Sequence, residues 1–183
     1  MAVKTMTVSS GGDDKFAEGW HELTIATAKY GESAGKKIIT LTFEGYPDNM
    51  DLRIYEAYTK KDNQEFKISN LFKHANAGIM GVLKDPSGKH PVIQYDDEAE
   101  NLVSKKVNVL FYKERKTGKG YTRMHDMLAP VMQEGEHLSY NAEEVETIKA
   151  SVKKSLDAFI SKQTTVNSEA PIEGEAPFAT NTF

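Results

Sequence analysis

The strongest constraint on the fold is a period of two in the apolar residues, which recurs in four separate stretches of the chain. The stretches lie at about 20–29, 37–44, 51–58 and 107–112. Because successive side chains of a strand point to opposite faces, this alternation predicts half-buried β-strands. Gly and Pro residues separate the first three stretches, so we expect three distinct strands before the middle of the chain.

The fourth stretch opens a segment, 105–128, that predicts a β-hairpin with a positively charged turn. Val107, Val109 and Phe111 alternate with polar or aromatic residues, and a Gly-containing turn leads to a second short strand at Tyr121. One acid, Glu114, accompanies five cations around the turn: Lys113, Arg115, Lys116, Lys119 and Arg123. Cations with flanking tyrosines suit a single-stranded nucleic acid, whereas an edge hairpin whose lysines only discourage aggregation is the alternative.

Two segments show the helical spacing of three and four. The first runs from 64 to 83, and the second, from 141 to 162, begins at Asn141 with Glu144 in a capping-box position. Between them, 91–95 suits a short edge strand and the acidic residues 96–100 suit a helical turn. The apolar stripe of the second helix either packs on its own chain or pairs with a copy in a homodimer.

The domain organisation follows from these elements. We expect a flexible arm at 1–15, a mostly β domain at 16–130, the appended helix at 141–162 and a disordered acidic tail at 163–183. Three strands, a helix and two strands form the element order of an OB-fold, a five-stranded Greek-key barrel with its helix between strands 3 and 4. Five strands and a helix also admit other arrangements.

Composition and motifs exclude several classes of protein. The chain has no Cys, no apolar run near the roughly 18 residues of a membrane span, and no secretory signal, so we expect a cytoplasmic protein. Neither a Walker loop nor a Gly-x-Ser-x-Gly motif occurs, and adjacent positions in a strand should point His125 and Asp126 to opposite faces. The acidic cluster matches no calcium loop. We therefore expect no catalysis, cofactor or metal.

Charge is distributed unevenly along the chain. The net charge is −4, but the last twenty residues contain Glu169, Glu173 and Glu175 without Lys or Arg, which leaves −1 on the rest. Local fields therefore matter more than the total charge for binding a nucleic acid.

Three pieces of sequence resemble small OB-fold single-stranded-DNA-binding proteins of bacteriophage replication regions. They are GWHELTI at 19–25 with KIITLTFE at 37–44, the segment NLVSKKVNV at 101–109, and a tail with acids and a terminal Phe183. The resemblance implies binding of unwound DNA in phage replication, recombination or repair, within the host cytoplasm. It also implies that Phe178 and Phe183 in the tail recruit replication or recombination proteins.

The sequence thus supports a sequence-tolerant binder of single-stranded DNA, with RNA as a second possible ligand. Tyr55 shares a strand face with Arg53, and Tyr112 with Asn108, whereas Phe43 and Phe111 share faces with core residues. The candidate nucleic-acid contacts are Trp20, Lys37, Arg53, Tyr55, Lys106, Tyr112, Lys113, Arg115, Lys116, Lys119, Tyr121 and Arg123. The rival hypothesis is a protein-interaction module that binds a replication or host protein through the tail and the acidic residues 96–100.

Overall fold

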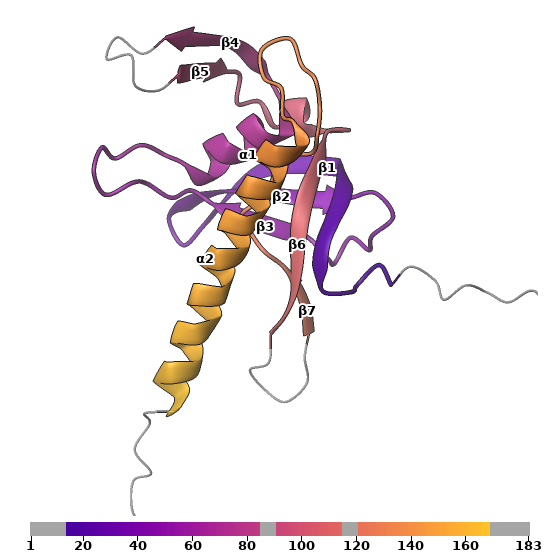
Figure 1. The fold of residues 1–183 in the computed structure, drawn as a ribbon, viewed down its shortest axis with the longest axis vertical. Coiled ribbons are helices and arrows are strands. Elements are labelled where there is room, and N and C mark those ends of the chain that lie inside the picture. Colours follow the sequence, from indigo (N-terminus) through magenta and orange to yellow (C-terminus); the bar gives the residue numbers. More distant parts are fainter. Residues whose placement is uncertain (1–13, 85–90, 115–120, 169–183) are drawn as a thin grey trace, which may run out of the picture.

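The computed structural model describes residues 14–84, 91–114 and 121–168 and contains a five-stranded antiparallel sheet (Figure 1). The strand order is β3-β2-β1-β6-β7. The strands are β1 (Gly19–Ser33), β2 (Lys36–Phe43), β3 (Leu52–Tyr55), β6 (Lys106–Glu114) and β7 (Tyr121–Met124). β1, β2, β3 and β6 each overlap one of the four stretches with a period of two, and β7 begins at Tyr121, where the second strand of the hairpin was predicted. The prediction of a mostly β chain is therefore confirmed.

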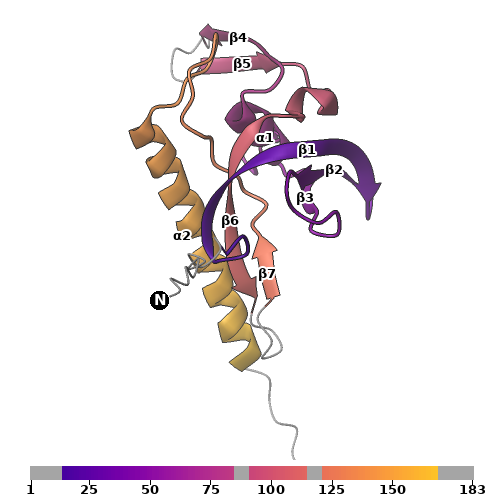
Figure 2. The ribbon, with the colours of Figure 1, turned by 90° about the vertical axis from the view of Figure 1, so that its right-hand side faces the viewer.

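β1 connects the two halves of the sheet. Its first part, Gly19 to Thr24, pairs with β6, and its second part, Ile25 to Ser33, pairs with β2. A register shift between Ile25 and Thr27 lies where the partner changes, and irregularities of this kind bend a strand. Figure 2 shows the resulting curvature of β1. The sheet therefore curls, with β3 and β7 as its two edges, and no ladder between described strands closes it into a barrel.

One face of the curled sheet forms the main core. Its inward residues alternate with outward ones as predicted, and Phe43 and Phe111 both lie in this core. Helix α1 (Lys67–Ala75) contributes Leu71 and Phe72, which are almost completely buried. Burial of such side chains contributes roughly 1.5–3 kcal/mol each.

The predicted helix 64–83 is wrong in its second half. Helix α1 ends at Ala75, Asn76 adopts a left-handed conformation with φ 50°, and the chain continues as strand β4 (Ile79–Lys84). Gly78 has φ +61°, and a Cβ there would lie 2.3 Å from the Asp96 carbonyl oxygen, so only glycine fits this turn. Apolar residues of β4 had matched the helical spacing by coincidence.

β4 pairs with β5 (Pro91–Tyr95) in a separate two-stranded sheet, which confirms the predicted strand at 91–95. The predicted helical turn is also present, as the 3-10 helix η1 (Ala99–Leu102). In Figures 1 and 2 the β4–β5 hairpin projects at the end of the molecule away from β7.

Helix α2 (Ala142–Ser168) begins at the predicted capping box and extends past residue 162, where the apolar pattern had ended it. The Glu144 amide donates to the Asn141 side chain, and the Asn141 amide donates to the Glu144 carboxylate, both at 2.9 Å. The helix packs on the outer face of its own sheet, where Val152 and Leu156 meet Leu110. Within the described part of the chain, no helix combines the length and apolarity needed to cross a membrane.

Candidate nucleic-acid interface

The two edges of the sheet face a common depression beside α2, which we call the seam groove. Its volume is about 690 Å³, within the rough 300–1,000 Å³ range of ligand sites. β3, β7 and α2 each contribute residues to its lining. The lining comprises Asn49, Met50, Asp51, Leu52, Arg53, Lys67, Tyr112, Thr122, Arg123, Met124, His125, Asp126, Met127, Ser155, Leu156 and Phe159.

Arg53 is the exposed cation on the β3 side of the seam groove. Leu52 and Ile54 point into the core, so the alternation of β3 turns Arg53 and Tyr55 outward. The side chain of Arg53 is 60% exposed, and its Nε donates to Asp51 at 2.8 Å. This contact orients the guanidinium, which carries further N–H donors for an anion. Tyr55, 37% exposed, lies two residues away on the same face.

Tyr112 and Arg123 occupy the opposite side of the groove. They are direct cross-strand partners in the β6–β7 ladder, and Arg123 is exposed. Tyr112 is half-buried because it also packs against the cluster that holds α2 on the sheet, formed by Leu110, Val152 and Leu156. Its ring lies edge-on to His125, with 6.3 Å between the ring centroids. Lys113 and Tyr121 continue the same hairpin, and the Tyr121 side chain is 61% exposed.

An ion pair between Lys67 of α1 and Asp126 lies in the lining of the groove. His125 Nδ1 is 3.5 Å from the Asp126 carboxylate, so the prediction that these two residues point to opposite faces is wrong. β7 ends at Met124, and strand alternation no longer applies after it. Burial lowers the pKa of His125, and Lys67 lowers it further, while Asp126 raises it. Burial is the largest of these effects, and it favours the neutral imidazole.

Six of the predicted contacts that the structure describes do not line the seam groove. Tyr55, Lys113 and Tyr121 lie close in sequence to lining residues, on β3, β6 and β7, and the other three have their own partners within the protein. Trp20 is half-buried under α2, where the Lys149 ammonium lies 5.9 Å from its ring centroid. Lys37 lies 4.1 Å from the Tyr30 ring and forms an ion pair of 3.3 Å with Asp97. The third residue, Lys106, pairs across the ladder with Glu22 at 2.9 Å.

The remaining candidates lie outside the described residues: Arg115, Lys116 and Lys119 of the hairpin turn, and Phe178 and Phe183 of the tail. Lys67 and Phe159 line the groove but were not among the contacts that the sequence predicted. Phe159 had been assigned to the packing stripe of the helix, and its position as the last residue of that stripe was the available signal.

The outer face of the sheet next to Arg53 is rich in small polar side chains. Thr40 is the direct partner of Arg53 and also of Lys29 on β1, and the Thr27 and Thr42 hydroxyls lie 2.8 Å apart. Lys29 is exposed. This surface extends the cationic side of the seam groove across β2 and onto β1.

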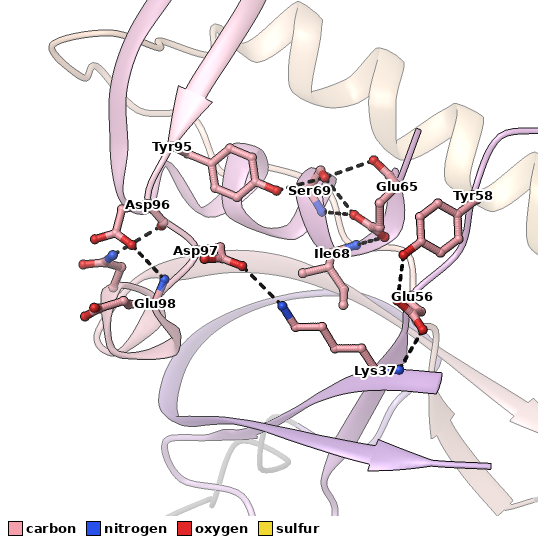
Figure 3. Close-up of polar contacts among 11 residues, drawn as sticks. Lys37, Glu56, Tyr58, Glu65, Ile68, Ser69, Tyr95, Asp96, Asp97 and Glu98 are labelled. Carbon is pink, nitrogen blue, oxygen red and sulfur yellow. Dashed lines mark hydrogen bonds and ion pairs between the residues drawn. The ribbon is translucent and has the colours of Figure 1, made fainter. Parts of the chain in front are cut away.

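Two of the acidic residues at 96–100, Asp96 and Asp97, have side-chain contacts within the protein (Figure 3). Asp97 accepts a hydrogen bond from Lys37, and the Asp96 carboxylate accepts one from the Glu98 amide at 3.1 Å. In the same region the Glu65 carboxylate caps α1 by accepting from the Ile68 amide at 2.8 Å. No group of three or more metal-ligating side chains occurs in the described ranges. These acids do not line the seam groove.

Comparison with known proteins adds no relative. A scan against protein-family models finds no match, and a search of the curated proteins finds none either.

Proposed function

We propose that this protein is a sequence-tolerant single-stranded-DNA-binding protein that acts in phage DNA replication, recombination or repair. The observation that supports the proposal best is the convergence of Arg53, Tyr112 and Arg123 on one groove. Arg53 is far in sequence from the hairpin that carries Tyr112 and Arg123, and the sequence predicted each of the three as a contact. Tyr55 and Tyr121 extend the same set of rings beyond the groove.

The architecture supports the finer proposal of an OB-fold. β1 is central, α1 follows the third strand, and the two free edges, β3 and β7, both line the seam groove. An OB-fold is a partly open five-stranded barrel, and the face of its strands 2 and 3 commonly meets oligonucleotides. On this proposal the β4–β5 hairpin is an insertion between the helix and the fourth strand.

The chemistry of the groove explains how such a protein binds without reading sequence. Arginine and lysine neutralise backbone phosphates and release counterions, which makes the affinity dependent on salt. Aromatic rings stack on bases of any kind, with roughly 1–3 kcal/mol per stacked base. A protein of this type would coat exposed strands in the host cytoplasm, and its tail would recruit replication or recombination proteins.

A titration tests this proposal directly. The protein is titrated at low salt with oligo-dT of about thirty nucleotides, roughly two OB-fold sites, and with matched duplex DNA and single-stranded RNA. We expect binding to oligo-dT that exceeds binding to the duplex and weakens steeply as salt rises. Absence of binding to any single strand at low salt would refute the proposal, and a preference for RNA would change the assigned ligand.

A protein-interaction module is the second candidate, and one observation favours it. The β4–β5 hairpin exposes Met80, Leu83 and Val92, and exposed apolar side chains gathered on one element are typical of protein contacts. On this alternative the tail and the acidic residues 96–100 also bind a replication or host protein. A pull-down with and without nuclease separates the two functions, because a partner held only through DNA is lost after nuclease treatment.

A further inference from the structure

Helix α2 continues beyond the part of the sheet that it covers. Val152 and Leu156 are buried against Leu110, and the stripe continues three residues later with Phe159. Phe159 is 52% exposed and belongs to the lining of the seam groove. The stripe that anchors the helix therefore ends in an aromatic ring beside the groove.

The position of this ring is set by the packing of the helix. Trp20, Tyr112 and Ile148 surround the contact between α2 and the sheet, so the helix is held on the sheet less than one turn before Phe159. A ring on a firmly held helix loses little conformational freedom when it contacts a ligand, which favours binding.

The opposite walls of the groove carry charge, which narrows the choice of ligand. Arg53 on β3 and Arg123 on β7 line the groove together with Phe159. An apolar helix from a partner would exclude water from these charged groups without adding an anion, and removing a charge from water is costly. A nucleotide meets both requirements, because its phosphate pairs with arginine and its base stacks on a ring.

We propose that α2 forms the third wall of the single-stranded-DNA site and that Phe159 stacks on a base whose neighbouring phosphates contact Arg53 and Arg123. This inference rests on the proposed function and adds a base contact from outside the sheet. The sheet supplies the cations, and the appended helix supplies the ring that faces them.

Substitution of the ring provides the first test. Phe159→Ala should weaken binding to oligo-dT roughly 5- to 150-fold, the range for loss of one stacked base. Ile160→Ala is the matched control, because Ile160 is 38% exposed on the same turn and does not line the groove. Its affinity should equal that of the wild type. Equal affinities of wild type and Phe159→Ala would overturn the inference and leave the proposed function intact.

A fluorescent ring provides the second test. Phe159→Trp in a Trp20→Phe background leaves one tryptophan, at the groove, and should restore affinity with strong quenching by oligo-dT. Unquenched fluorescence with tight binding would place the strand elsewhere and overturn the inference. A lower sedimentation mass of the free Phe159→Ala variant would do the same, because the ring would then belong to a contact between copies. If the wild-type protein binds no single-stranded nucleic acid at all, the proposed function itself is refuted, and the inference about Phe159 is refuted with it.

Discussion

Arg53 offers the most direct test of the electrostatics of the seam groove. The described residues that line it include three cations, Arg53, Lys67 and Arg123, and two carboxylates, Asp51 and Asp126, so the lining has a formal charge of +1 when His125 is counted as neutral. Arg53→Met reduces this charge to zero, and Asp51→Asn raises it to +2. The two substitutions should therefore change DNA affinity in opposite directions.

The magnitude follows from counterion release. Loss of one phosphate contact to a single strand lowers the slope of log K against log salt by roughly 0.7, which corresponds to about a five-fold weaker affinity at about 0.1 M salt. We expect this loss for Arg53→Met and a gain of similar size for Asp51→Asn. Fluorescence anisotropy with labelled oligo-dT, repeated over a series of salt concentrations, measures both.

The control is another exposed cation in an exposed ion pair. Lys153 on α2 lies 2.9 Å from Asp157 and does not line the groove. Because exposed ion pairs contribute little to stability, Arg53→Met and Lys153→Met should both remain folded. Only the former should change the salt slope. Equal losses of DNA affinity in the two variants would refute the argument that Arg53 acts locally, within the groove. It would also be refuted if the loss of affinity in Arg53→Met stayed the same as salt rises toward 1 M.

Three further predictions concern the surroundings of the groove. Trp20→Phe should bind oligo-dT within about two-fold of the wild type in anisotropy titrations, because Trp20 packs under α2 and does not line the groove. Asn108→Leu should lower the free energy of unfolding in urea by roughly 1–3 kcal/mol, because it removes the 2.7 Å hydrogen bond to the buried Pro130 carbonyl; unchanged stability would contradict this. Burial lowers the pKa of His74 to about 4, so the unfolded chain binds a proton near pH 6.5 that the folded chain does not, and stability falls as pH falls from 6.5 to 4. The contribution of His74 should approach about 3 kcal/mol, and the drop should be smaller by that amount in His74→Asn, as urea denaturation at a series of pH values would show.

Local patterns predicted the strands and their faces well. The outward position of Arg53 and Tyr55 and the inward position of Phe43 and Phe111 both follow from the period of two, which is a property of the strand backbone itself. The capping box at Asn141 also depends only on residues within one turn.

The predictions from local patterns were wrong where one spacing fits two kinds of secondary structure, or where a strand ends earlier than its sequence indicates. Ile79 and Leu83 fit the spacing of a helix, but the left-handed Asn76 and the close approach of Gly78 to Asp96 end α1 before them. His125 and Asp126 follow the last residue of β7, so the rule of opposite faces did not apply to them.

The sequence by itself determined where the strands of the five-stranded sheet lie, which side of each of them carries cations and rings, and where α2 begins. Only the tertiary structure decided that β3, β7 and the end of α2 meet in one groove, and that Trp20 is covered by α2. Alternation and capping depend on neighbours in the chain. The meeting of two sheet edges depends on the bend in β1 and on packing between residues many positions apart.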